Sequence, residues 1–251
     1  MLEYRDVSLA VGKTGILENI NVTFKTGKLT TVIGPNGCGK TTLVQALNGM
    51  SRIVSGSVLI DGTDINRMKL RDRAKKVSFL PQVRDFIPQM TVGLLVSHGR
   101  FPYLGFSRQM TAHDRQEVKA ALERTDLSEL SGMRADTLSG GVRQRAFVAL
   151  QLAQECDLVV ADEPTTYLDI SVKKKILEIY SSLRNEGKTV VLVLHDIPAA
   201  LSLSDEIVVM QDRVVKGTGT PRELLGSGLI EEVFGVKIKK FTDDEGDHYY
   251  V

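Results

Sequence analysis

Polar and apolar positions alternate in the first part of the chain, which is the pattern of half-buried β-strands. Residues 1–33 therefore predict strands and turns, and a glycine-rich loop follows them. A helical period begins after that loop and ends at a glycine. The expected elements of this part are strands at Asn19–Phe24, Leu29–Ile33 and Ser57–Ile60, and a helix from near Thr41 to Gly49.

The period becomes helical between about Pro88 and Gln154. Beyond it, two short apolar runs flank a further helical stretch. This order of apolar strand, helix and apolar strand predicts a parallel sheet that is covered on both faces. The expected elements are helices at Ala112–Thr125, Val142–Gln154 and Val172–Arg184, and strands at Leu158–Ala161 and Thr189–Leu194.

The last part of the chain predicts short elements at the edge of this sheet. Glu206–Met210 and Arg213–Lys216 form an expected hairpin, residues 222–234 are helical in pattern, and Val236–Phe241 pairs with His248–Val251. No linker-like run of Pro, Gly or Ser divides the chain. We therefore expect one α/β domain over residues 1–251, with a helical insertion at about 85–157.

Composition narrows the class of protein. The 251 residues include 32 Lys+Arg and 31 Asp+Glu, a net charge of +1, which gives no general attraction to nucleic acid or anionic lipid. No apolar run approaches the roughly 18 residues of a membrane span, and the first residues lack the pattern of a signal peptide. The two cysteines, Cys38 and Cys156, are too few for a disulfide framework, which favours a reducing, cytosolic setting.

The glycine-rich loop has the spacing GxxxxGK[ST] between a predicted strand and a predicted helix. In that setting, backbone N–H groups and the start of the helix cradle phosphates, a lysine reaches the terminal phosphates, and a hydroxyl ligates Mg²⁺. We expect Lys40 to be that lysine and Thr41 to be the magnesium ligand. The candidate phosphate-binding residues are Gly34, Pro35, Asn36, Gly37, Cys38, Gly39, Lys40, Thr41 and Thr42.

An acidic pair follows the buried strand at Leu158–Ala161. Because parallel strands deliver their carboxyl ends to a ligand crevice, Asp162 is expected to hold Mg²⁺ and Glu163 to orient or deprotonate an attacking water. The alternative for this pair is a turn before Pro164.

A second anion site is indicated by Ser139, Gly140 and Gly141, which open the helix expected at Val142–Gln154. The alternative for these three residues is a simple helix cap.

Six motifs follow one another along the chain, namely GPNGCGKTT (34–42), LPQ (80–82), LSGGVRQR (138–145), LVVADEP (158–164), YLD (167–169) and LHD (194–196). In this order they resemble the motifs of the ATP-binding subunit of an ATP-binding cassette (ABC) transporter. That resemblance implies a P-loop NTPase (RecA-like) core with an antiparallel β subdomain and an inserted α-helical subdomain. It also implies that Gln82 senses metal and water, that His195 contacts the γ-phosphate, and that Asp169 communicates across a subunit interface.

The same resemblance implies an assembly. Two copies would stack head to tail around two ATP molecules and Mg²⁺, each ATP lying on Gly34–Thr42 of one copy and under Ser139–Gly141 of the other. Two membrane permease subunits would dock at the helical insertion, and a substrate-binding protein would supply the cargo. The chain would then work at the cytoplasmic face of the cell membrane, with no nucleic-acid partner.

Residues 97–127 and PTTYLDI (164–170) resemble importers for iron–siderophore, haem and cobalamin complexes, and a siderophore is the expected cargo. Haem and cobalamin remain open. A soluble ABC ATPase of DNA repair, translation or cluster assembly is an alternative from another class. A P-loop kinase or GTPase is a third, although it leaves LSGG and the LHD histidine without a role.

The sequence departs from the family pattern at two positions. Val142 stands where a Gln is usual, and Val11 occupies the region where an aromatic residue usually stacks on adenine. Val11 offers apolar contact without stacking, so weak discrimination between ATP and GTP is expected. Cys38 lies near a helix start that can lower the pKa of a thiol, and the alternative is that it is a small filler residue. Alkylation of Cys38 is expected to block activity by bulk. His98, His113 and His248 lack ligand partners at metal spacing.

Overall fold

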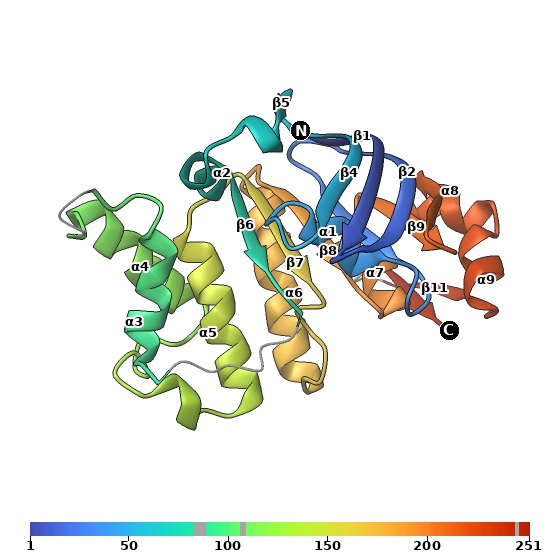
Figure 1. Ribbon diagram of the computed structural model, residues 1–251. Helices are drawn as coiled ribbons and strands as arrows, with labels where there is room; N and C mark the ends of the chain where they lie inside the picture. The colour runs from blue at the N-terminus through green and yellow to red at the C-terminus, as the bar shows by residue number, and fades with distance from the viewer. Residues whose placement is uncertain (83–88, 106–108, 244–245) are drawn as a thin grey trace.

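A computed structural model describes residues 1–82, 89–105, 109–243 and 246–251. Its core is a six-stranded sheet in the order β10-β9-β3-β8-β7-β6, in which all neighbours are parallel except the edge pair β9–β10 (Figure 1). This confirms the parallel sheet predicted from the apolar runs. The strands are β3 (Leu29–Ile33), β6 (Val77–Leu80), β7 (Leu158–Asp162), β8 (Thr189–Val193), β9 (Glu206–Gln211) and β10 (Val214–Gly219).

A second, antiparallel sheet has the order β2-β1-β4-β5 and packs over one face of the parallel sheet. Between the two sheets lies α1 (Lys40–Gln45), which follows the phosphate loop. The strands of this sheet are β1 (Leu2–Val11), β2 (Thr14–Phe24), β4 (Arg52–Ile60) and β5 (Thr63–Asp64). Of these strands, β2 and β4 begin before the strands predicted at Asn19–Phe24 and Ser57–Ile60 and end at the same residues.

Three helices form a separate layer beside the parallel sheet, away from the antiparallel sheet (Figure 1). They share their own apolar cluster, to which Val142 contributes, so the residue that departs from the family pattern is partly buried among helices. These helices are α3 (Val92–Ser97), α4 (Ala112–Arg124) and α5 (Gly140–Ala153), joined by the short 3-10 turns His98–Arg100 and Ala135–Thr137. The expected start of the insertion near residue 85 lies outside the described residues.

The remaining helices cover the parallel sheet and its edge. They are α2 (Leu70–Lys76), α6 (Ile170–Asn185), α7 (Ile197–Leu203), α8 (Pro221–Gly226) and α9 (Leu229–Phe234), together with the 3-10 turn Ile65–Arg67. The single helical stretch predicted at 222–234 was wrong, because Gly228 adopts a left-handed φ of 73° and separates α8 from α9.

The predicted pairing at the end of the chain is confirmed by β11 (Lys239–Asp243) and β12 (Gly246–Tyr250). Within the parts of the chain described, none of the helices has the length and apolar character needed to cross a bilayer.

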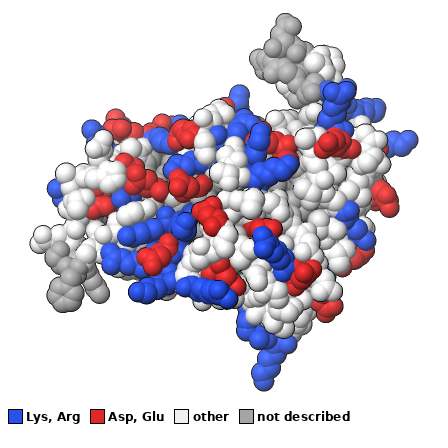
Figure 2. All heavy atoms as spheres, turned by 90° about the horizontal axis from the view of Figure 1, so that it is seen from above, with Lys and Arg blue, Asp and Glu red and all other residues white. Residues whose placement is uncertain are grey.

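Side chains of the central strands point alternately into two cores. In β8, Val191 and Val193 join the cluster under the antiparallel sheet, while Val190 and Leu192 join the cluster under α6 and α7. Both faces are therefore dry, and this explains why the strand reads as a continuous apolar run. Outside these cores, basic and acidic side chains are interspersed over the face seen from above (Figure 2).

Candidate functional site

The phosphate loop joins the fully buried β3 to α1, and two of its glycines are required by their surroundings. A Cβ on Gly34 would lie 2.1 Å from the carbonyl oxygen of Met210. Gly39 precedes α1 with a φ of 100°, and a Cβ there would lie 2.4 Å from a methyl carbon of Leu17. Only glycine fits these two positions, so the loop is fixed by its packing against β9 and β2.

Lys40 is buried, and its ammonium group is held by the loop itself. Its Nζ donates to the carbonyl oxygens of Gly34 at 2.8 Å and Pro35 at 3.1 Å. Because both of these partners are neutral carbonyl oxygens, they leave the ammonium group able to exchange them for the oxygens of an anion.

Asp162 ends β7, is fully buried, and faces the first turn of α1. The hydroxyl of Thr41 donates to its Oδ1 at 3.2 Å, while its Oδ2 has no hydrogen-bond partner within the described part of the chain. Burial raises the pKa of Asp162 to about 6, and the Thr41 hydrogen bond opposes this only in part. A buried carboxylate oxygen without a partner, beside a hydroxyl, suits a hard divalent cation such as Mg²⁺.

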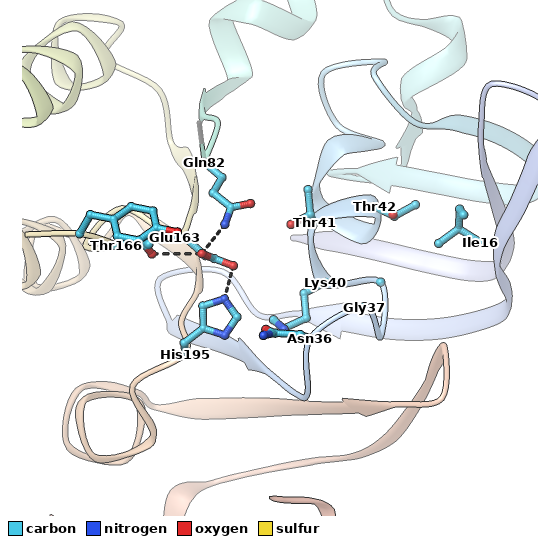
Figure 3. A pocket seen from close by; sticks show the side chains of 12 residues that line it. Ile16, Asn36, Gly37, Lys40, Thr41, Thr42, Gln82, Glu163, Thr166 and His195 are labelled. Carbon is cyan, nitrogen blue, oxygen red and sulfur yellow. Dashed lines mark hydrogen bonds and ion pairs between the residues drawn. The ribbon is translucent and has the colours of Figure 1, made fainter. Parts of the chain in front are cut away.

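Glu163 is the next residue, and three side chains converge on its carboxylate (Figure 3). Its backbone adopts a left-handed φ of 50°, which is strained for a residue with a side chain. Gln82 donates from Nε2 to Oε2, the hydroxyl of Thr166 donates to the same oxygen at 3.0 Å, and Nε2 of His195 contacts Oε1. The carboxylate is therefore nearly buried yet held at the edge of an open cavity.

This cavity has a volume of about 670 Å³ and gathers residues from both sheets and several strand ends. Among the predicted residues it brings together Asn36, Gly37, Gly39, Lys40, Thr41, Thr42, Gln82, Glu163 and His195. The sequence reasoning missed three further lining residues, Ile16, Thr166 and Tyr167. The position of Thr166, three residues after Glu163 in a turn, was the one available signal.

Other predicted residues lie away from the cavity lining. Ser139 precedes α5 and makes no side-chain cap there, while Gly140 and Gly141 are the first residues of that helix. Asp169 caps α6 by accepting from the backbone N–H of Val172 at 2.9 Å. One chain therefore presents its two expected anion sites separately.

Five more candidates are also outside the lining, namely Gly34, Pro35, Cys38, Val11 and Asp162, of which Asp162 contacts the lining residue Thr41. Val11 ends β1 and is 45% exposed, and the neighbouring apolar residue that reaches the cavity is Ile16 of β2. Cys38 is buried, and burial raises the pKa of its thiol despite the nearby Lys40. The expectation of a lowered thiol pKa was therefore wrong, because loss of hydration outweighs the start of the helix.

The helical layer holds a buried ion pair. Arg100 is 1% exposed and donates to Asp114 at 2.8 Å, to Glu155 at 3.0 Å and to the carbonyl of Ala153 at 2.9 Å. His113 lies between Glu155 and Glu117, so the expectation that it lacks ligand partners at metal spacing was wrong. Glu155 is 42 residues away in sequence, which is why spacing did not reveal this cluster.

The family model "ABC transporter" matches residues 17–166. The petrobactin import ATP-binding protein YclP of Bacillus subtilis (strain 168) is 37% identical over 245 residues, covering 97% of this chain and 96% of that protein. The ferric enterobactin transport ATP-binding protein FepC of Escherichia coli (strain K12) is 35% identical, covering 96% and 90%. The cobalamin import ATP-binding protein BtuD of Halobacterium salinarum (strain ATCC 29341 / DSM 671 / R1) is 34% identical, covering 95% and 59%.

Solved structures agree with these relatives. An inward-facing ABC transporter has a TM-score of 0.82 at 24% identity, covering 99% of this chain and 96% of that chain, which shows the shared fold. A dimeric ATP-binding cassette bound to ADP and Pi in a post-hydrolysis state has a TM-score of 0.78 at 28% identity, covering 88% and 99%.

The fold and the site together define a P-loop nucleotide hydrolase. A phosphate loop, a buried aspartate suited to Mg²⁺ and an adjacent glutamate meet at the ends of the parallel strands. Within that class, the chain belongs to the ABC transporter family and is one of its ATP hydrolases.

Proposed function

We propose that this chain is the ATP-hydrolysing subunit of an importer for iron–siderophore complexes. Relatives named for petrobactin and ferric enterobactin support that cargo, each at 35% identity or more over nearly the whole chain. Cobalamin stays an alternative, since a cobalamin import ATP-binding protein is 34% identical. Haem is the other alternative of the same kind.

The observation that carries the hydrolytic assignment is the end of β7, where Asp162 and Glu163 face the phosphate loop. In our proposal, residues 34–42 cradle the phosphates, and Lys40 exchanges its two carbonyl partners for phosphate oxygens. Thr41, Gln82 and Asp162 would hold Mg²⁺, which supplies charge neutralisation to the phosphates. Glu163 orients and deprotonates the attacking water, and His195 contacts the γ-phosphate.

A second copy of the chain would complete the site. Ser139, Gly140 and Gly141 lie outside the lining of the cavity in their own chain, so an anion site on one copy is available to nucleotide on another. The exposed Tyr167 and Ile170, at 97% and 85%, are suited to burial between copies near Asp169. The dimeric cassette among the related structures supports this homodimer.

The domain organisation and partners follow from the same proposal. Residues 1–251 form a single ABC ATPase domain whose helical part, at about 85–157, receives two membrane permease subunits at the cytoplasmic face of the membrane. A substrate-binding protein delivers the cargo to those subunits. Co-purification with an integral membrane protein tests this proposal against a soluble ABC ATPase of another class.

The substitution Glu163→Gln tests the catalytic part. Removing the base while keeping the shape is expected to lower kcat at least about a hundredfold and to trap a dimer that retains ATP. Turnover by the purified chain and its mass in solution with ATP and Mg²⁺ are the measurements. A Glu163→Gln chain that turns over normally, or stays monomeric with ATP, would contradict the proposal.

A further inference from the structure

The Thr166 hydroxyl is the local partner of the Glu163 carboxylate. Glu163 to Thr166 form a turn in which the backbone N–H of Thr166 faces the carbonyl oxygen of Glu163 at 3.4 Å. Within this turn, the Thr166 Oγ1 donates to Glu163 Oε2 at 3.0 Å. Thr166 also lines the cavity, so this contact sits where the chemistry is expected (Figure 3).

The two other partners of Glu163 come from different elements. Gln82 follows β6 and is 81 residues away in sequence, while His195 follows β8 and is 32 residues away. Both also have expected roles toward the nucleotide, and a side chain that turns to phosphate or metal gives up its carboxylate contact. Thr166 belongs to the same turn as Glu163, so its contact persists when the strand ends shift relative to each other.

We propose that Thr166 is a positioning residue for ATP hydrolysis, an inference that rests on the proposed role of Glu163. Its hydroxyl holds Oε2, so that Oε1 is left to accept the proton of the attacking water once His195 turns from Oε1 to the γ-phosphate. Glu163 has a left-handed backbone conformation, but this conformation does not fix the torsion angles of the Glu163 side chain. One hydrogen bond within the turn restricts those torsions and favours a single carboxylate orientation.

Three substitutions in the full-length chain test this role. Thr166→Val removes the hydroxyl at nearly constant shape, and kcat is expected to fall about tenfold, as for loss of a hydrogen bond to a charged group. KM for ATP and ATP-driven dimerisation should stay within about twofold, because Thr166 acts on the water through Glu163. Thr166→Ser keeps the hydroxyl and should restore most of kcat. Thr165→Val, at the buried neighbour outside the cavity lining, is the matched control and should turn over normally.

The same assays include Glu163→Gln, which separates two failures. Normal turnover by Glu163→Gln would overturn the role of Glu163 itself. A large loss with Glu163→Gln but unchanged kcat with Thr166→Val would overturn only the role of Thr166. A rise in KM at constant kcat, an equal loss in Thr165→Val, or no restoration by Thr166→Ser would also overturn it. If the valine variant does not fold, Thr166→Ala is measured in its place with the same expected loss.

Discussion

A residue that serves the chemistry of the site can lower the stability of the folded chain, and Asp162 is the clearest example. Its carboxylate is fully buried with one oxygen unpartnered, and burial raises its pKa to about 6. At neutral pH the folded chain therefore buries Asp162 in its ionised form, although burial favours the neutral form. This burial lowers the stability of the folded chain, but it leaves Oδ2 of Asp162 without a hydrogen-bond partner in the described part of the chain, and such an oxygen is a suitable ligand for a cation.

We predict that Asp162→Asn makes the nucleotide-free chain more stable, by roughly 2 kcal/mol, because a neutral group of the same shape replaces a buried charge. Thermal unfolding without nucleotide is the measurement, and turnover with Mg²⁺ and ATP should be lost in the same variant. Asp157→Asn, at a side chain 96% exposed, is the control and should shift Tm little. A lower Tm for Asp162→Asn would contradict this account.

Base recognition is the second prediction at the scale of residues. The apolar lining residue from the antiparallel sheet is Ile16, which offers contact without ring stacking. We therefore expect kcat/KM for ATP and GTP to agree within about fivefold in steady-state assays. Ile16→Ala should raise KM for both nucleotides alike and leave kcat unchanged, since the lost contact is the same before and during reaction. A strong preference for ATP would show that another group reads the base.

The sequence predicts site residues best where function imposes a spacing. The phosphate loop and the acidic pair occupy fixed offsets from buried strands, and the structure places Lys40, Thr41 and Glu163 around one cavity as expected. Thr166 was missed because its one signal, a hydroxyl three residues after Glu163, does not by itself show that the turn brings this hydroxyl to the carboxylate. Ile16 was missed for another reason, since it precedes the strand predicted at Asn19–Phe24 and its apolar side chain carries no chemical group that indicates a site.

At the scale of elements, apolar runs gave β3, β7, β8 and β9 within one residue, whereas the parallel strand β6 was not predicted and short helices were less well predicted. The helix expected to reach Gly49 ends at Gln45, and the stretch at 222–234 divides at Gly228. Strand positions are set by burial on two faces, which leaves a strong periodic signal. Helix ends depend on local caps and on backbone angles that are weakly encoded.

The helical layer depends on its buried ion pair. Burial acts to raise the pKa of Asp114, but hydrogen bonds from Thr111 and from Arg100 outweigh it and lower the pKa to about 2. Asp114→Asn should destabilise the chain by about 3 kcal/mol at pH 7, because the buried Arg100 loses a charged partner. Urea unfolding measures this difference, and Arg134→Ala, which breaks the exposed pair with Asp136, is the control with less than about 1 kcal/mol.

The pH dependence gives this prediction its sign. The folded pKa of Asp114 is below the unfolded value near 3.8, so its stabilisation is complete above pH 4 and is lost as pH falls through 2. The gap between wild type and Asp114→Asn should therefore narrow between pH 4 and pH 2. A gap that stays constant over that range would mean that packing, and not charge, is what the substitution removes.

At the scale of the whole molecule, one chain keeps apart the two parts of the nucleotide site that we propose. The cavity with Lys40 and Glu163 and the start of α5 at Gly140 are separate in the same copy. If two copies close on ATP, turnover per chain depends on how many chains are paired. We predict that specific activity falls on dilution and that the ATP dependence has a Hill coefficient above 1. Activity measured over a hundredfold range of protein concentration tests this, and a constant specific activity would contradict the homodimer.

The left-handed turn at Glu163 has a consequence for laboratory evolution. A glycine there would relax the backbone at once, and it would also delete the carboxylate. Libraries screened for heat resistance alone would therefore accumulate the stable but inactive variant Glu163→Gly. Screens that combine heating with a measurement of phosphate release would exclude this variant.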